Sequence, residues 1–407
     1  MNPSTPSSSR SLSWDVVRVV AVVSVVVQHA TYTVSGVMPF LAPPPFVWPV
    51  EAGANVLMVV SGFFLCVTLA KRGAGSWWWH RMARLIPAYL VAVVLTYLAT
   101  VVAAGYGYGW RPGLRDLVGN LLLVQSWDPR VTPMDGSYWT LPLQVGAFTL
   151  AALAVAATGG PAFWRRPGVL PATAWGGIVL GLVLGVLATD RLRVVVNGLV
   201  VFRWQLFAIG LAMWLAHRGR ISVPHLIALT VSGVATEYVL TPDPVATVAL
   251  GVGCIAIGAA ALGPDWTVLR VGPLPRVLSW MAGISFGIYL INQQIGYFAA
   301  WALQDGFGIT GWVRIGVVVG LAIALGWMLT VLAERPLHRL LTRAQREKDA
   351  AAERNRSFSS AVPVETRTPS PANARTTTLL SSACDENAAA SSPSGSQTKF
   401  AADTGTR

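Results

Sequence analysis

Apolar runs of about 20 residues recur along most of the chain, and they limit its fold more than any other feature. About 20 apolar residues are what an α-helix needs to cross the hydrocarbon core of a bilayer. From residue 14 to residue 333 only short polar breaks separate these runs, and over the whole chain 54% of the residues are hydrophobic and 12% are charged. A soluble domain carries about 25% charged residues. The sequence therefore predicts an all-α polytopic membrane protein.

The apolar runs predict about ten transmembrane helices, with boundaries accurate to a few residues. They cover approximately 14–34, 50–70, 85–104, 138–157, 169–188, 194–216, 224–240, 243–263, 278–303 and 310–332. The first run has no small-residue cleavage site after it, so we expect a retained span and not a signal peptide. The stretch 117–124 is too short to cross the bilayer and is expected to be interfacial or re-entrant.

Basic residues cluster in the loops that follow the even-numbered runs. They are Lys71, Arg72, Arg81, Arg84, Arg165, Arg166, Arg218, Arg220, Arg270, Arg276, Arg335, Arg339 and Arg343. Because cytoplasmic loops carry an excess of Lys and Arg, these loops and both termini are predicted to be cytoplasmic. The long loop 105–137 mixes Arg with Asp and is predicted to lie outside. The net charge of +12 follows from this topology, so we expect membrane lipids, and no nucleic acid, as partners.

The composition changes near residue 343, where Ser, Thr, Ala and Pro replace the apolar runs. We expect residues 343–407 to form a disordered cytoplasmic tail, residues 1–13 a polar N-terminal segment, and residues 14–342 the transmembrane domain. Three scattered cysteines predict neither a disulfide framework nor a metal site. The Arg-rich, Lys-poor composition is typical of GC-rich bacteria, so the predicted location is the bacterial inner (plasma) membrane.

Two ionisable residues stand out in the first apolar run. Arg18 and His29 are eleven residues apart, which is close to three helical turns, so both point to one side about 16 Å apart along the helix. Asp15 precedes Arg18 by one turn. Ionisable groups inside a lipid-spanning helix are costly and usually mark a functional interior, and a neutral His there is a candidate proton acceptor. The alternatives are a hydrogen-bonded core histidine and a structural Asp15–Arg18 ion pair.

A second pair of cations begins the third run. Arg81 and Arg84 are three residues apart at a predicted helix start, so both can face one target. Two guanidinium groups match the geometry of phosphate. The alternative is that they are ordinary positive-inside residues. In the preceding run, Ser61 and Gly62 favour close helix packing over a nucleophilic role, because small residues let membrane helices approach each other.

Five motifs, in chain order, resemble those of the integral-membrane acyltransferase-3 family, which adds acyl groups to glycans, lipids and secondary metabolites. They are Arg18 with His29; Ser61-Gly62-Phe63 followed by Arg81, Arg84, Pro87 and Tyr89; Trp139 with Gln144; Ser285 with Tyr289 and Leu290; and Glu334-Arg335-Pro336. Together they extend over about residues 12–340. Each motif is weak alone, but five in order on a ten-span chain are fairly specific.

The resemblance implies a membrane O-acyltransferase. A small acyl group such as acetyl would pass from acyl-CoA to a hydroxyl of a glycan, glycolipid or secondary metabolite. His29 would be the general base. Arg18, on the same helix face, would orient the donor or, together with Asp15, fix the helix, and Arg81 and Arg84 would hold the phosphates of CoA. Acyl-CoA would be a substrate, and no tightly bound cofactor or metal is expected.

The same resemblance implies substrate-binding roles for four residues. They are Trp139, Gln144, Tyr289 and Asn292. The family usually has Glu where this chain has Gln144, and often His where it has Asn292. Both departures replace a titratable group with a neutral amide that still forms hydrogen bonds. They leave two alternatives open: a polytopic transporter or flippase, and a catalytically inactive acyltransferase-like protein.

Overall fold

A computed structural model describes residues 11–69, 73–107, 110–345 and 347–348, and within these residues the regular elements are helices, with no strand. The last long helix reaches Gln345, so the chain is still helical where we expected the tail to begin. Residues 1–10 and 349–407, which include almost all of the expected tail, lie outside the described residues.

Most helices lie within the predicted spans, but the third span begins at Ala74 and not near residue 85, so Arg81 and Arg84 lie inside a helix and not at its start. The described residues contain eight or nine candidate spans in place of the predicted ten. The helices are α1 (Leu12–Gln28), α2 (Val34–Val37), α3 (Gly53–Leu69), α4 (Ala74–Gly105), α5 (Leu114–Leu121), α6 (Thr140–Ala157), α7 (Pro161–Trp164), α8 (Val169–Leu187), α9 (Asp190–Gly198), α10 (Trp204–His217), α11 (Val223–Leu240), α12 (Pro244–Leu262), α13 (Leu274–Ile291), α14 (Gln293–Phe307) and α15 (Gly311–Leu329). Two π-helical turns, η1 (His29–Thr33) and η5 (Thr330–Glu334), extend α1 and α15, and short 3₁₀ turns include η2 (Gly136–Trp139) and η3 (Val201–Arg203).

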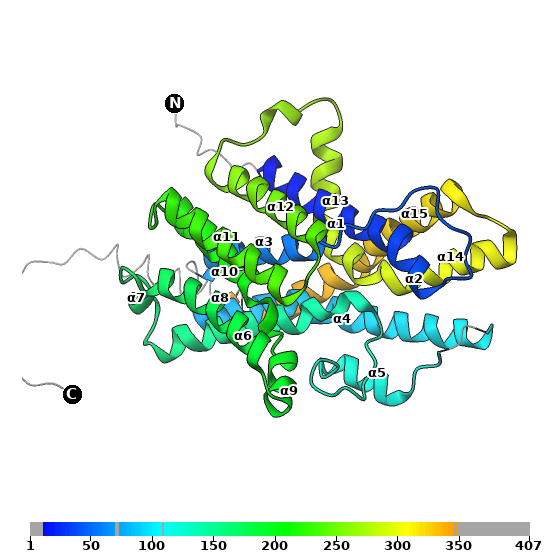
Figure 1. Cartoon of the computed structure of the whole chain (residues 1–407), viewed down its shortest axis with the longest axis horizontal. Coiled ribbons are helices and arrows are strands. Elements are labelled where there is room, and N and C mark those ends of the chain that lie inside the picture. The colour runs from blue at the N-terminus through cyan, green and yellow to red at the C-terminus, as the bar shows by residue number, and fades with distance from the viewer. Residues whose placement is uncertain (1–10, 70–72, 108–109, 346, 349–407) are drawn as a thin grey trace, which may run out of the picture. The chain divides into compact units, whose positions relative to one another are not determined.

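Among the described residues, eight helices are long and apolar enough to cross a membrane, and a ninth span is possible if a bent pair counts as one. The helix α3, with 17 residues, is apolar but shorter than these. The predicted all-α polytopic fold is therefore confirmed. The stretch predicted to be interfacial or re-entrant begins inside α5, which lies beside α4 (Figure 1) and is joined to it by the bond from the Tyr89 hydroxyl to the Asn120 carbonyl oxygen, 2.7 Å.

Two expected spans are interrupted. The run 278–303 is not one helix, because α13 ends at Ile291 and α14 begins at Gln293, with the break at Asn292. The run 194–216 comprises α9, η3 and α10, and this pair of helices is bent by 47°. The bend coincides with Val200, whose φ of +51° is a left-handed conformation that non-glycine residues seldom adopt.

Contacts between loops support the predicted alternation of the chain across the membrane. The Ser11 hydroxyl donates to Asp265 (2.9 Å), which joins the N-terminal segment to the loop after α12. Arg220, after α10, donates to the Arg165 carbonyl oxygen (3.1 Å), after α6. Trp79, in the second turn of α4, donates from its indole N–H to the Leu341 carbonyl oxygen (2.9 Å), beyond α15. Loops that we predicted to share one side are therefore neighbours.

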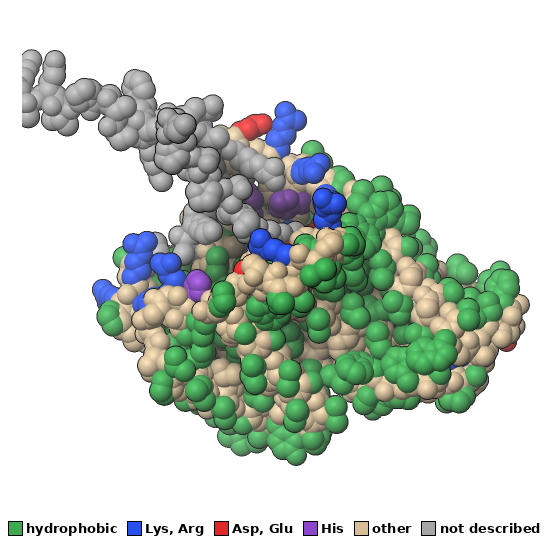
Figure 2. Space-filling view, turned by 90° about the horizontal axis from the view of Figure 1, so that it is seen from above, with side chains coloured by type: hydrophobic (Ala, Val, Ile, Leu, Met, Phe, Trp, Pro, Cys, Tyr) green, Lys and Arg blue, Asp and Glu red, His purple; other side chains and the backbone are tan. Residues whose placement is uncertain are grey.

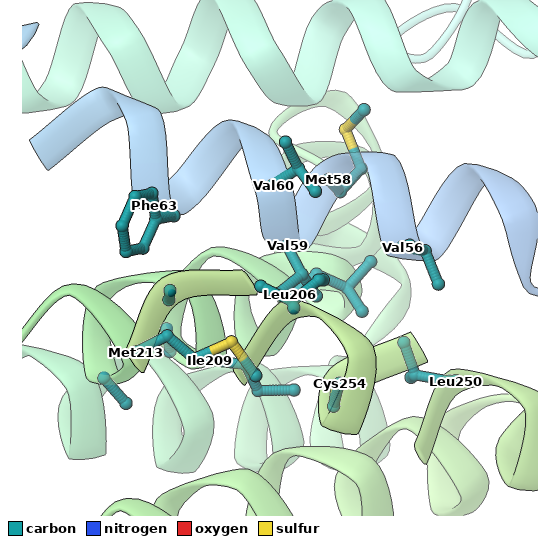
Figure 3. Packing of buried hydrophobic residues seen from close by; sticks show 14 of the residues in the cluster. Val56, Met58, Val59, Val60, Phe63, Leu206, Ile209, Met213, Leu250 and Cys254 are labelled. Atoms are coloured by element: carbon teal, nitrogen blue, oxygen red, sulfur yellow. The ribbon is translucent and has the colours of Figure 1, made fainter. Parts of the chain in front are cut away.

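The largest buried cluster is centred on the crossing of α3 and α10, where Val59 faces Leu206 (Figure 3). Glycines let the two backbones approach closely. A Cβ at Gly62 would lie 2.8 Å from the Phe207 carbonyl oxygen, and a Cβ at Gly210 would contact the backbone of Val59. The interpretation of Ser61 and Gly62 as a packing site agrees with this geometry.

The outer surface has the character of a lipid-facing protein. Hydrophobic side chains cover most of the face shown in Figure 2, while Lys and Arg side chains gather at one side of it. Many of these apolar residues would be poorly placed in water; Ile255 is 74% exposed and Val186 is 56% exposed. A continuous apolar surface with its cations at the margin fits burial in a bilayer.

Candidate active site

A cavity of about 250 Å³ lies beside the end of α1 and contains several of the residues that the sequence singled out. Its lining comes from α1 and η1, the loop before α3, the start of α3, η2, η3, the adjoining ends of α11 and α12, and the facing ends of α13 and α14. The lining also includes the indole of Trp139. Its polar residues are Gln28, His29, Thr33, Glu51, Asn55, Ser137, Arg203, Glu237, Thr241, Asp243, Thr247, Tyr289 and Gln293. The sequence predicted His29, Trp139 and Tyr289 as site residues.

His29 is the first residue of the π-helical turn that follows α1. Isolated π-helical turns are rare and often lie at functional sites. The Nδ1 atom of His29 is 2.6 Å from Oδ1 of Asn292, which lies at the break between α13 and α14. The ring of Tyr297 meets the imidazole edge-on at 6.5 Å between centroids. His29 is thus held by α14 and by the helix break while it lines the cavity.

The turn η2 forms another wall and is fixed at both ends. Asp135 caps it by accepting from the Ser137 N–H (2.8 Å), and its second oxygen accepts from the Gln294 N–H (2.9 Å) at the start of α14. Burial raises the pKa of Asp135 to about 6, against the effect of these two bonds. The Tyr289 hydroxyl donates to the Ser137 carbonyl oxygen (2.8 Å), which orients that ring beside the cavity.

A buried ion pair occupies the part of the cavity formed by η3 and α11. Arg203 pairs with Glu237, whose side chain is 4% exposed. The Glu237 carboxylate also accepts from Asn55 (3.0 Å) and from Gln205 (2.6 Å). The Arg203 guanidinium lies 5.1 Å from the centre of the Trp139 ring, a cation–π distance. Glu237 therefore has three hydrogen-bond or ion-pair donors, and Trp139 packs against the Arg203 guanidinium.

The loop residue Glu51 adds a second carboxylate to the lining, and it accepts from the Gln28 amide (3.0 Å). Burial raises the pKa of Glu51, and the nearby charge of Asp243 raises it further, while Arg203 and the Gln28 bond oppose both effects. With Glu237 and Asp243, three carboxylates line the cavity against one arginine, Arg203. The cavity therefore disfavours an anionic ligand.

The predicted cation residues lie elsewhere, around the C-terminal half of α3. Arg81 donates to the Phe64 carbonyl oxygen (2.9 Å) and to the Thr68 hydroxyl (2.6 Å). The Arg18 guanidinium lies 4.7 Å from the centre of the Phe64 ring. Arg18 and Arg84 are close enough to Arg81 for their charges to repel it. Three guanidinium groups thus converge, and none of them lines the cavity.

Arg84 is the most accessible member of this arginine cluster, which we define as Arg18, Arg81 and Arg84. Its side chain is 54% exposed, and its Nε donates to Glu334 at 3.3 Å. The Arg-x-x-Arg motif and the Glu-x-Pro motif, far apart in sequence, are therefore neighbours. The arginine cluster and His29 lie near opposite ends of α1, because Arg18 and His29 are eleven residues, or about 16 Å, apart along the helix.

The remaining predicted residues, Asp15, Gln144 and Asn292, are not part of the cavity lining. Asp15 is buried and accepts from the Ser279 hydroxyl (2.6 Å), which joins α1 to α13. Gln144 is buried in α6, beyond Trp139. Asn292 is buried behind His29, and its amide nitrogen donates to the carbonyl oxygens of Ile288 (3.2 Å) and Tyr289 (2.8 Å).

The family model for an acyltransferase domain, that of the acyltransferase-3 family, matches residues 11–331. The chain belongs to the acyltransferase-3 family. The match covers every helix from α1 to α15, and so it includes both the cavity and the arginine cluster. Comparisons with curated proteins and with solved structures each give no match. The family and the membrane-type helices together identify a multi-pass membrane protein of acyltransferase type.

Sequence reasoning identified part of the cavity lining and missed the rest. Arg203 and Glu237 were recognisable as charges inside apolar runs, but no motif joined them to His29. Glu51, Asn55 and Asp243 gave no signal, because polar residues at the ends of apolar runs are ordinary. The only available signal was charge at membrane depth, which is costly and therefore seldom accidental.

Proposed function

We propose that this protein is a membrane O-acyltransferase that moves a small acyl group, such as acetyl, from acyl-CoA to a hydroxyl of a glycan, glycolipid or secondary metabolite. The observation that carries the proposal is the position of His29, whose imidazole lines a polar cavity inside an acyltransferase-3 domain. A neutral histidine that lines a cavity of this kind is a candidate proton acceptor.

The arginine cluster supports a donor site at the other end of α1. The phosphates of CoA are multiply charged, and clustered guanidinium groups bind such anions well. Arg84 has an exposed side chain that can reach a soluble ligand. If the basic loops are cytoplasmic, as the positive-inside rule predicts, this site faces the compartment that contains acyl-CoA.

The cavity supports an acceptor site. Its volume of about 250 Å³ suits one ring or one chain end of a larger molecule. Trp139 offers an apolar face, and the carboxylates and amides around it are suited to hydroxyl groups. The cavity is lined by the loop 38–52 and by residues 241–243, which lie on the side opposite the basic loops in the predicted topology.

The chemical step follows from these positions. His29 removes the proton of the acceptor hydroxyl as its oxygen attacks the thioester carbonyl carbon. The new ester C–O bond forms, the C–S bond breaks, and the imidazolium returns the proton to the CoA thiolate. A general base of this kind contributes about 10²–10⁴-fold to the rate.

The test compares the wild type with His29→Gln in purified protein. Labelled acetyl-CoA is supplied with an extract of host glycans, lipids and metabolites, and free CoA and labelled product are followed. His225→Gln is the matched control, because His225 lies outside the cavity and accepts from Trp175 (3.0 Å), which a glutamine can also do. We expect at least a hundredfold loss in His29→Gln and near wild-type turnover in the control.

Two results would count against the proposal. Equal activity in wild type and folded His29→Gln would remove the histidine from the mechanism. Absence of both turnover and acyl-CoA binding in the wild type would contradict the enzymatic function, and solute flux in reconstituted vesicles would then favour the transporter.

A further inference from the structure

The side chain of Asn292 is fixed in one orientation by the helix break. The α13 helix ends at Ile291, so its last carbonyl groups lack helical partners. The Asn292 amide nitrogen donates to two of them, at Ile288 and Tyr289. A carbonyl oxygen only accepts, so the nitrogen of the amide must face α13, and its oxygen must face the other way. That oxygen is the atom 2.6 Å from His29.

This orientation determines which nitrogen of His29 carries the proton. The Asn292 oxygen has no hydrogen to donate, so the His29 Nδ1 atom must be the donor in this bond. A neutral imidazole has one N–H, and the other nitrogen then holds a lone pair. The Nε2 atom of His29 is therefore the nitrogen left free to accept a proton.

We propose that Asn292 is a positioning residue that holds His29 as the Nδ1–H tautomer, so that Nε2 is the general base of acyl transfer. The role in catalysis rests on the proposed function; the tautomer does not. Asn292 itself is buried and lies behind the ring, so it does not contact the acceptor. This differs from the substrate-binding role that the family resemblance implied.

An amide in this position holds the ring without adding charge. A carboxylate there would also accept from Nδ1, but it would stabilise the imidazolium, which cannot act as a base until it loses its proton at higher pH. A neutral side chain at position 292 therefore suits the proposed role. The Asn292 amide holds His29 as the Nδ1–H tautomer without stabilising the imidazolium.

Other ionisable groups face the same region and are unchanged by substitutions at 292. They are Glu51 and Asp243 from the loops, Arg203 and Glu237 from η3 and α11, Tyr289 from α13, Tyr297 from α14, Asp135 at the cap of η2, and Arg314 from α15. A change in the pH profile that appears only in a charged variant at 292 is therefore assigned to that residue.

The first experiment measures pH–rate profiles of wild type, Asn292→Asp and Asn292→Ala. The aspartate variant should keep the acceptor oxygen and shift the acidic limb of kcat/KM to higher pH by one unit or more. The alanine variant should lose at least tenfold in kcat with little change in KM, because wrong tautomers then compete. A purely structural role would instead lower the stability of both variants without moving the acidic limb in Asn292→Asp, and that result would overturn the proposal.

The second experiment observes the tautomer directly. Histidine labelled with ¹⁵N is introduced into the full chain, which contains five histidines, and the His29 signals are identified by their loss in His29→Gln. Neutral His29 should show a protonated Nδ1 and an unprotonated Nε2, and Asn292→Ala should show a mixture. A protonated Nε2 in the wild type would overturn the proposal whether or not the protein is active. The expected tautomer in a protein without turnover would instead contradict the proposed function.

Discussion

The Arg203–Glu237 ion pair allows a quantitative test of the cavity. Removing one partner of a buried pair leaves an uncompensated charge, which typically costs about 3–5 kcal/mol. Both side chains line the cavity and are not fully enclosed by protein, so we use the lower end, about 3 kcal/mol, for Arg203→Met. That variant leaves the Glu237 carboxylate with only the Asn55 and Gln205 amides as donors.

Replacement of the other partner, Glu237, should lower the free energy of unfolding by less. In Glu237→Gln the Arg203 guanidinium keeps its cation–π contacts with the rings of Trp139 (5.1 Å) and Phe202 (5.6 Å), each of which contributes roughly 0.5–1 kcal/mol. We expect a loss of about 2 kcal/mol. The double variant contains neither charge, so it should lose about 2–3 kcal/mol in place of the sum of about 5 kcal/mol, which is a coupling of about 2–3 kcal/mol.

The assay is reversible unfolding in mixed micelles, with an increasing fraction of denaturing detergent and tryptophan fluorescence as the signal. All four proteins of the cycle are compared at one pH and one salt concentration. Additive losses, with the double variant about 5 kcal/mol less stable than wild type, would refute the assignment of a coupled buried pair. An Arg203→Met protein as stable as wild type would refute the burial argument itself.

Three further predictions concern packing, pH and a loop. Gly210→Ala should lose about 1–3 kcal/mol through overpacking against α3, whereas Gly251→Ala, whose Cβ would meet nothing within 4 Å, should be neutral or slightly stabilising in the same unfolding assay. The pKa of Asp135 is raised to about 6 by burial, so the folded state holds a proton that the unfolded state has lost, and stability falls as pH rises from about 4 to 6; the stability of wild type relative to Asp135→Asn should drop by up to about 3 kcal/mol over that window. Arg314 is 2% exposed and donates to the Ala42 carbonyl oxygen (2.5 Å), so Arg314→Met should increase amide hydrogen exchange in the loop 38–52 before it affects the helices.

The helical fold was predictable because each membrane span must satisfy its own backbone hydrogen bonds within an apolar run of sufficient length. The interruptions were not. The break at Asn292 follows no proline or glycine, and it depends on an amide side chain that serves the end of α13 and His29 at once. The bend near Val200 depends on the left-handed backbone conformation of this residue. The sequence does not predict it, because valine seldom adopts that conformation.

The candidate site was predictable only where the chemistry is rare in a membrane. His29 was recognisable because a histidine in a lipid-spanning helix is costly, and Trp139 and Tyr289 through the motifs that they share with the family. The prediction that Arg18 and His29 share one side of the first helix followed from helical periodicity. Their contacts did not follow from it: Arg18 contacts Phe64 and His29 contacts Asn292. Periodicity gives the face of a residue, and only packing gives its neighbours.

The proposed acyl transfer would use two entrances, one near each end of α1, and the charges at these two ends differ. Glu51, Glu237 and Asp243 give the cavity more negative than positive charge, so CoA phosphates at that end would be repelled. The arginine cluster at the other end brings three positive charges together, so it would attract the same phosphates and would offer no advantage to a neutral hydroxyl. If both ends accepted either ligand, the donor would compete with the acceptor for His29. Under the proposed function, opposite electrostatics would therefore direct the donor to one end of α1 and the acceptor to the other, and the thioester would have to extend along the helix to meet the proposed base.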